Sequence, residues 1–396
     1  MITTAFEFIT FVVVCLGIYL WVSIKYENCK LFKYIPPLVF MYVFFVCCTN
    51  FGVFYVGEGS VPQMVRKTVT NYCVPLLVYA VIIQCAPRKI LKLGPKLLMC
   101  FFVCVVSMWA GCFISGFVFK DVLSIPDIPE TFGTLCASFI GGPENLFAVA
   151  NAVSLSDAAM ANCLILIELV YSPWLIFLMA GLPALWNKFN KWVNADLTPV
   201  LEAGDRISVD DKEKRPINVF DIYKVVGVGL LLELICMKLG DLTNALIPSF
   251  PSGVMMYIYL TIGAMILASY TNLGKNPLAK PLSTTISCLL VAMGTLGVDL
   301  SYFKGAGWLL AASVLVIVIH AVVMIIYAKI TKTDLYTLGC VSIATVGGNS
   351  SAPVVAACYE DKSGAYVPMA TLFAACGSIC GTVGGLVIVK LLSLFC

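Results

Sequence analysis

Apolar segments follow one another along this chain almost without a pause. Each is about 20 residues long, which is the length a helix needs to cross a hydrocarbon core of about 30 Å. Because 60% of the residues are hydrophobic and only 12% are charged, the composition lies far outside the soluble range. We expect an all-α polytopic membrane protein, with segments near 2–23, 36–56, 69–86, 97–119, 131–153, 158–185, 221–240, 252–270, 283–302, 305–330, 335–358 and 366–395.

Several classes of function are not indicated by the residues. The 18 cysteines show no Cys-x-x-Cys spacing, so neither a metal site nor a disulfide framework is predicted. The net charge of +3 is too small to suggest a nucleic-acid partner, and no phosphate-binding motif occurs. His320 and Asp299 lack a nucleophile partner, so we do not expect an enzyme, and no cofactor is expected beyond a coupling ion.

A polar linker at 186–217 divides the chain into two halves of similar length. Shifting the chain by 206 positions aligns residues 131–153 with residues 337–359, and six positions are then identical, including a Gly-Gly pair. Both windows are the fifth segment of their half. Duplicated halves are typical of transporters, so we predict two repeats.

The charges of the short loops predict that these halves are inverted. Basic loops follow segments one and three in the first half, but segments eight and ten in the second. Since cytoplasmic loops collect Lys and Arg, the halves are expected to have opposite topology. This pattern requires an odd number of crossings, so 11 or 13 fits better than 12.

The aligned Gly-Gly pairs belong to the motifs GGPEN (141–145) and GGNSS (347–351), which lie where a membrane helix should be unbroken. Irregular backbone at membrane depth is tolerated where it is buried in protein or lines a cavity, and paired interruptions indicate a transporter site. Close helix packing through small residues is the alternative explanation. The predicted substrate-binding residues are Gly141, Gly142, Pro143, Glu144, Asn145, Gly347, Gly348, Asn349, Ser350 and Ser351.

Glu168 is a carboxylate in the middle of an apolar segment, where an unpaired charge costs on the order of 3 kcal/mol. It must be protonated, bind a cation or face water, which is the chemistry of coupling transport to an ion. A protonated Glu168 bonded to a neighbouring helix is the structural alternative. The predicted ion-coupling residues are Glu168, Glu144, Asn145 and Asn349, with Na⁺ or H⁺ as the ion.

The motifs SFIGGPENLFAVANAV, IELVYSP and SIATVGGNSSAPVVAA resemble an uncharacterised membrane family, domain of unknown function 819. That family is similar to the cation–proton antiporter and bile-acid sodium symporter superfamily. The resemblance implies two crossed, discontinuous helices in a mobile core beside a scaffold that forms a homodimer. Two departures affect the presumed substrate site: Pro143-Glu144 replaces the usual Ser-Val, and Asn349 replaces a Pro.

We therefore expect a secondary active transporter of the plasma membrane, with no nucleic-acid partner. Paired helix N-termini favour a small organic anion, such as an amino-acid or peptide derivative. A passive channel or facilitator that uses the same broken helices is the alternative function. The predicted domains are a first inverted repeat at 1–185 (scaffold 1–90, core 95–185), the linker at 186–217, and a second repeat at 218–396 (scaffold 218–302, core 304–396).

Overall fold

The computed structural model is helical almost throughout the residues that it describes, which are 2, 4–26, 37–56, 59–85, 87–123, 125, 127–207, 215–248, 250–295, 306–359 and 364–395. Its helices, in chain order, are α1 (Ala5–Lys25), α3 (Pro37–Asn50), α4 (Val61–Ile82), α5 (Pro87–Ile90), η1 (Leu91–Leu93), α6 (Pro95–Phe119), α7 (Ile128–Gly141), α8 (Pro143–Ala152), α9 (Asp157–Ile176), η2 (Phe177–Gly181), α10 (Leu182–Val193), α11 (Thr198–Arg206), α12 (Val219–Leu246), α13 (Ser252–Tyr270), η3 (Leu273–Lys275), α14 (Ala279–Thr295), α15 (Ala306–Thr331), α16 (Leu335–Val346), α17 (Gly348–Ala356) and α18 (Tyr366–Leu392).

Six helices in the described part of the chain are long and apolar enough to cross a bilayer: Ala5–Lys25, Pro95–Phe119, Ala158–Val193, Ser252–Tyr270, Gly307–Thr331 and Tyr366–Leu392. This confirms the prediction of an all-α membrane protein. Two of the twelve predicted segments, 131–153 and 335–358, are not single helices, because each is a pair of shorter ones. The predicted number of 11 or 13 crossings stays a prediction.

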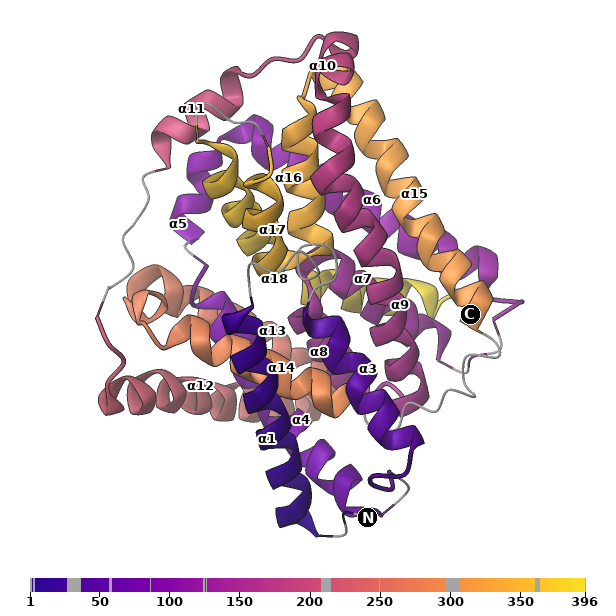
Figure 1. The fold of residues 1–396 in the computed structure, drawn as a ribbon, viewed down its shortest axis with the longest axis vertical. Helices are drawn as coiled ribbons and strands as arrows, with labels where there is room; N and C mark the ends of the chain where they lie inside the picture. Colours follow the sequence, from indigo (N-terminus) through magenta and orange to yellow (C-terminus); the bar gives the residue numbers. More distant parts are fainter. Residues whose placement is uncertain are drawn as a thin grey trace.

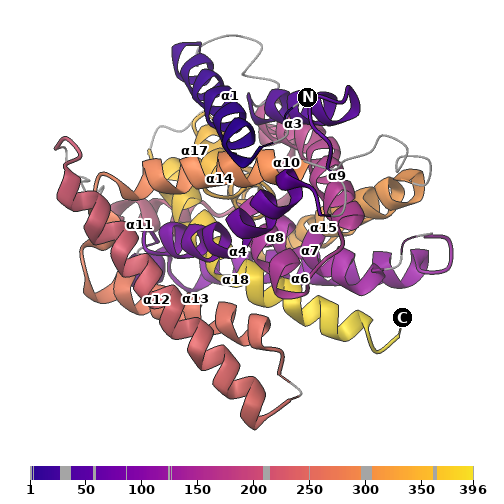
Figure 2. The same ribbon diagram turned by 90° about the horizontal axis from the view of Figure 1, so that it is seen from below.

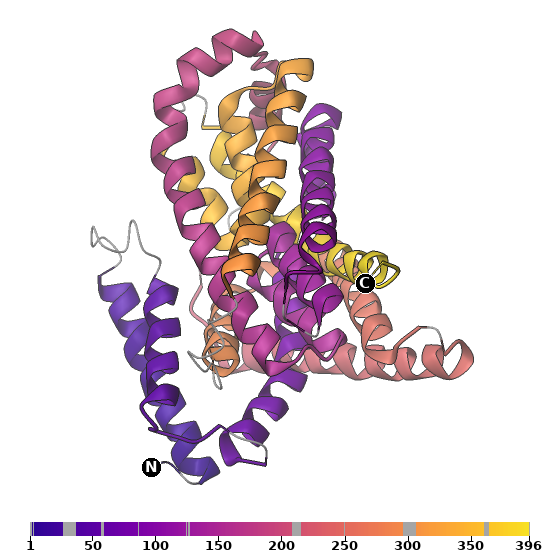
Figure 3. The same cartoon turned by 90° about the vertical axis from the view of Figure 1, so that its right-hand side faces the viewer.

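The helices fall into two groups in Figure 1. α6 and α15 stand in the upper half, and the continuous helix made of α9, η2 and α10 runs from the top into the lower half, where α12, α13 and α14 lie. α6 packs against α15, α12 against α13, and α4 against α14. Figure 2 shows α12 at the edge of the molecule, and Figure 3 shows α1 and α3 side by side. The division into scaffold and core stays a prediction.

α18 is the helix that positions α7, and it does so through glycines. A Cβ built on Gly385 would lie only 2.6 Å from the Gly133 carbonyl oxygen of α7. A Cβ on Gly377 would overlap the Ile140 carbonyl oxygen in the same way. Such backbone-to-backbone packing is typical of membrane helices, where small residues allow the closest approach. The end of α7 is therefore held against the backbone of α18.

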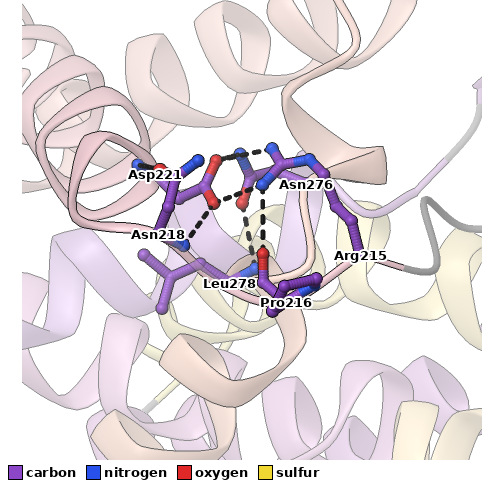
Figure 4. A network of polar contacts seen from close by, with 6 residues as sticks. All are labelled: Arg215, Pro216, Asn218, Asp221, Asn276 and Leu278. Atoms are coloured by element: carbon purple, nitrogen blue, oxygen red, sulfur yellow. Dashed lines mark hydrogen bonds and ion pairs between the residues drawn. The ribbon is translucent and has the colours of Figure 1, made fainter.

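The predicted linker is partly helical, because α10 extends into it and α11 lies within it, while residues 208–214 lie outside the described residues. At its end Arg215 donates hydrogen bonds of 2.6 and 2.7 Å to the two carboxylate oxygens of Asp221, and Asn276 donates one of 2.7 Å (Figure 4). The Arg215 guanidinium holds the pKa of the Asp221 carboxyl well below its usual range. This network fixes the end of the linker to the start of α12 and to the connection before α14.

Candidate functional site

The first interruption lies between α7 and α8, at Gly142. Its φ of 89° is a left-handed conformation that favours glycine, and Pro143 then starts α8, where a missing N–H is tolerated. α8 turns back beside α7. A Cβ built on Gly385 would lie 2.6 Å from the Gly133 carbonyl oxygen of α7 and 2.9 Å from the Val149 side chain of α8, so Gly133 and Val149 lie close together. In one straight helix these residues would be about 24 Å apart. α7 and α8 thus form a helical hairpin, the first hairpin, with Gly142 at its tip.

The second interruption lies between α16 and α17, where Gly348 has a φ of 62°. Tyr336 at the start of α16 stacks on Tyr359, just beyond α17, with ring centroids 4.3 Å apart. One straight helix would place these two tyrosines about 35 Å apart. α16 and α17 are therefore also a helical hairpin, the second hairpin, with its tip at Gly347 and Gly348.

The two tips are in contact. A Cβ built on Gly142 lies 3.5 Å from the Gly348 Cα, and one built on Gly348 lies 3.4 Å from the Gly142 Cα. These glycines are 206 positions apart, which is the shift that aligns the two halves. The predicted breaks thus lie together, but the prediction of crossed helices is corrected: each segment folds back at its break, because α18 offers a backbone surface on which both arms of the first hairpin pack.

Glu144 lies in the first turn of α8, two residues beyond the tip glycine. Its Oε2 is buried and has no hydrogen-bond partner among the described residues. A Cβ on Gly142 would lie 2.9 Å from this oxygen, so the carboxylate bends over the tip. The thiol of Cys85, which follows α4, is within electrostatic reach. A carboxylate thus occupies the positive end of the α8 dipole.

Asn145 holds the first hairpin against α18. Its Oδ1 accepts a hydrogen bond of 2.7 Å from Thr382 Oγ1, and its side chain lies where a Cβ on Gly141 or Gly381 would overlap it. The residue is only 2% exposed. Gly141 also meets the Gly377 carbonyl, 2.5 Å from a built Cβ. Close packing, the alternative explanation of the Gly-Gly pair, therefore describes Gly141, whereas Gly142 makes the break.

Glu168 lies on α9 beside the second hairpin. Its Oε2 is buried without a partner in the part of the chain that the structure describes, and the hydroxyls of Tyr171 and Tyr19 are within electrostatic reach. The Tyr171 hydroxyl is 2.5 Å from Ser351 Oγ, and its ring lies 3.0 Å from a Cβ built on Gly347. α9 therefore brings a carboxylate and a hydroxyl to the second tip.

Asn349 and Ser350 lie in the first turn of α17, next to the second tip, but their side chains lie outside what the structure describes. Ser351 is the polar side chain of the GGNSS motif with described contacts. The structure thus brings the backbone of both motifs together, with Glu144 at one tip and Glu168 beside the other. The roles given to these residues stay predictions.

A hydrogen-bonded chain that the sequence analysis missed fixes α16. Trp174 Nε1 donates to Ser342 Oγ (2.9 Å), which meets His320 Nε2 (2.9 Å); His320 Nδ1 meets Ser107 Oγ (2.8 Å), which donates to the Cys104 carbonyl (2.6 Å). Since Ser107 uses its hydrogen on that carbonyl, it accepts from His320 Nδ1, which therefore carries a hydrogen. The chain joins α9, α16, α15 and α6. No spacing in the sequence could reveal it, because its members are far apart.

Tyr171 could have been found from the sequence. It follows Glu168 by three residues, so the two side chains share one face of a helix. Chemically, the tips offer two carboxylate oxygens that have no hydrogen-bond partner among the described residues, and these oxygens lie beside two helix N-termini. Such groups can bind a proton or a hard cation, and the helix N-termini can receive an anion once that charge is neutralised.

The structure thus defines a multi-pass, all-helical membrane protein, in which two helical hairpins are in contact at their tips. Residues 10–395 match the family described as "Protein of unknown function (DUF819)". The chain belongs to this family, as the motifs predicted. It is 25% identical over 194 residues to "Uncharacterized membrane protein YjcL" of Bacillus subtilis (strain 168), and the match covers 47% of this chain and 46% of that protein.

Proposed function

We propose that this protein is a secondary active transporter that moves a small organic anion together with Na⁺ or H⁺. The observation that carries the proposal is the contact of Gly142 with Gly348, beside the buried Glu144 carboxylate. Irregular backbone at membrane depth is tolerated where it lines a site, and interruptions at equivalent places in two halves are typical of transporter binding sites. Positive φ angles at both glycines support the predicted repeat.

Coupling follows from the charge of Glu144. An anionic solute about 5 Å from an ionised carboxylate would be repelled by about 3 kcal/mol at an effective dielectric constant of 20. That is more than a hundredfold loss of affinity. A proton or Na⁺ on Glu144 removes the repulsion, so solute and ion bind together. Glu168, near the second tip, is the second candidate for the ion, with Tyr171 and Ser351 as neighbouring oxygen ligands.

Transport then requires the paired tips to face each side of the membrane in turn. In the proposed mechanism the core, which includes both hairpins, moves against the scaffold in an elevator-like step. The scaffold forms a homodimer and the protein lies in the plasma membrane. The substrate class is a carboxylate-bearing anion, such as an amino-acid or peptide derivative.

A thermal-shift screen tests the proposal. Purified protein is heated with and without Na⁺, at several pH values, across small organic anions and short peptides. A ligand present at 100 times its Kd adds about 2.7 kcal/mol of stability. We expect a stabilising anion whose effect requires Na⁺ or low pH, and we expect Glu144→Gln or Glu168→Gln to remove that requirement.

Flux in reconstituted vesicles separates this function from the alternative. Saturable anion uptake with a fixed ion-to-solute ratio supports a transporter. A passive channel or facilitator would move the anion only down its own gradient and independently of the ion gradient, whether or not the flux saturates, and that result would overturn the proposal.

A further inference from the structure

Four oxygen-bearing side chains form a row along one face of α7. They are Asp127 at its N-cap, Thr131, Thr134 and Ser138, and their spacings of four, three and four residues place them on the same side of a helix. Each has a buried oxygen without a hydrogen-bond partner among the residues that the structure describes. Thr131, Thr134 and Ser138 are 0% exposed. We call these four residues the oxygen row.

Most helical Ser and Thr hydroxyls with described contacts behave differently. They donate to the carbonyl one turn back, as those of Thr49, Thr68, Thr243, Thr261, Ser269, Ser313, Thr371 and Ser378 do, although the buried Ser115 of α6 also has no partner among the described residues. Buried polar groups are nearly always paired with protein or with ordered water. The oxygen row thus marks a place where the described residues do not supply the partners.

The second hairpin has no such row at the positions 206 residues further on. There Thr337 donates to Asp334 Oδ2 at 2.5 Å, the Cys340 thiol meets the Tyr366 carbonyl at 3.9 Å, and Ala344 has no polar group. The row is therefore a property of the first hairpin and not of the repeated backbone.

The spacing of the row suits water and not one metal ion. Neighbouring positions on a helix face are about 5–6 Å apart, which equals two hydrogen bonds of about 2.8 Å through one water molecule. A hard cation such as Ca²⁺ holds its oxygen ligands at about 2.3–2.6 Å, so ligands spread over the roughly 16 Å from Asp127 to Ser138 cannot share it. The row can form a chain of hydroxyls and waters, along which protons move.

The row ends at the tip of the first hairpin. Ser138 is the last member, and its carbonyl accepts the N–H of Gly142 (2.8 Å). Beyond the tip lies the unpartnered Oε2 of Glu144. At the other end, Asp127 is half-buried at the start of α7. The row therefore runs along α7 from its first residue to the turn before the tip, where the Glu144 carboxylate lies.

We propose that the oxygen row is a proton path from Asp127 to Glu144. A proton that enters at Asp127 passes from oxygen to oxygen through hydroxyls and bridging waters, each of which accepts one proton and releases another. One proton is taken from solution and one is bound by Glu144, so nothing is oxidised or reduced. The inference deepens the proposed function, because it assigns H⁺ as the ion that Glu144 binds.

The surroundings of Glu144 fit this assignment. On the α4 side the Cys85 thiol is within electrostatic reach, and the Cys376 thiol of α18 is within reach of Cys85 in turn. On the side where α8 meets α18, the neighbouring Asn145 and Thr382 are neutral and bonded to each other. None of these described neighbours carries a positive charge that would pair with an ionised Glu144, so its carboxylate is free to bind a proton.

Infrared difference spectroscopy after a pH jump tests the path without any solute. The carboxyl band lost in Glu144→Gln identifies Glu144, and its rate of protonation is followed in purified protein. We expect the triple variant Thr131→Val, Thr134→Val, Ser138→Ala to slow that rate at least about tenfold, the ratio that corresponds to one lost net hydrogen bond, and to leave the final amplitude unchanged. The single variant Thr134→Val should slow it in the same direction if the triple variant does not fold.

The matched control is Thr261→Val with Ser313→Ala, since both hydroxyls are buried but bonded to their own helix. Its rate should equal that of the unmodified protein. An unchanged rate in the row variants, an equal slowing in the control, or the absence of a Glu144 band would overturn the proton path. Normal protonation through the row without ion-coupled solute flux would overturn the proposed transport function alone.

Discussion

The two hairpins differ most in how their polar side chains are partnered. In α7 the hydroxyls of Thr131, Thr134 and Ser138 have no partner among the described residues, whereas in α16 Thr337 and Ser342 are bonded to protein groups. The hairpins share a break at equivalent glycines and meet at their tips. The two hairpins therefore share a backbone arrangement but differ in the way their polar side chains are hydrogen-bonded.

Side-chain hydrogen bonds position the second hairpin. The bonds from Trp174 through Ser342 to His320 hold α16, and the Tyr171–Ser351 bond holds α17. The first hairpin is positioned by close backbone contacts with α18, and the buried hydroxyls of its α7 have no hydrogen-bond partner among the described residues. Four predictions test this comparison.

The largest effect is expected from the glycine before each tip. In Gly141→Ala the new Cβ would overlap Asn145 and lie 2.5 Å from the Gly377 carbonyl, which is backbone. In Gly347→Ala it would meet the side chains of Ser351 at 2.7 Å and Ile343 at 2.9 Å. The Gly377 carbonyl belongs to the long helix α18, whereas Ser351 Cβ belongs to the short helix α17 and Ile343 Cδ1 is the flexible end of a side chain. We therefore expect a loss of about 3 kcal/mol for Gly141→Ala and a smaller one of about 1 kcal/mol for Gly347→Ala, measured by thermal unfolding in detergent.

The control for these variants is Gly227→Ala in α12, where a Cβ would meet nothing within 4 Å. It should be neutral or stabilising by up to about 1 kcal/mol. Equal losses in both hairpins would contradict the view that only the first is packed on backbone.

Removing a hydroxyl that has hydrogen-bond partners should cost more stability than removing one for which the described residues offer none. Ser342→Ala leaves the Trp174 indole N–H and His320 Nε2 unpaired, so we expect a loss of about 1–3 kcal/mol. Thr134→Val removes a hydroxyl that has no protein partner, and we expect no loss or a small gain in the same unfolding measurement. A comparable loss in both variants would show that Thr134 is bonded within the protein.

Each hairpin is also tied by a side-chain hydrogen bond near its tip. Tyr171→Phe removes the bond to Ser351 and Thr382→Val removes the bond to Asn145. We expect each to cost about 1 kcal/mol, with the larger loss for Thr382→Val because Asn145 is fully buried and its Oδ1 would be left unpaired. Equilibrium unfolding in denaturant measures both, and the reverse order would mean that α17 depends on α9 more than α8 depends on α18.

The smallest expected effect is on the pH dependence of stability, and it arises near the start of α16, at the end of the second hairpin away from its tip. Asp196 lines a crevice with Asp334 and Thr337, and its hydrogen bonds with Thr198 and then Lys96 lower its pKa to about 2. Its unfolded pKa is about 3.9, so its stabilisation is fully present above that pH and is lost as the pH falls toward 2.

For an exposed pair this contribution is at most about 1 kcal/mol. Melting temperatures between pH 5 and pH 3 should therefore fall slightly more in the unmodified protein than in Asp196→Asn. Parallel curves for the two proteins would show that the pair contributes nothing.

The sequence predicted those features that depend on neighbouring residues. Apolar length predicted membrane helices, and the paired glycines with nearby prolines predicted breaks at Gly142 and Gly348. The direction of the chain after each break was wrongly predicted, because it depends on the glycine face of α18, which is more than 200 residues from Gly142. Asn145 Oδ1 accepts a hydrogen bond from Thr382, a contact that no local pattern encodes, and the ion-coupling role predicted for Asn145 stays a prediction.

Both hairpins pack on α18, which follows them in the chain. Gly377 and Gly385 receive the first hairpin, and Tyr366 packs against Tyr336 of the second. During synthesis, both hairpins therefore enter the bilayer before the surface that holds them exists. The hairpins therefore reach their final position late in biogenesis. In a chain stalled on the ribosome before α18 is made, both hairpins would lack the helix on which they pack.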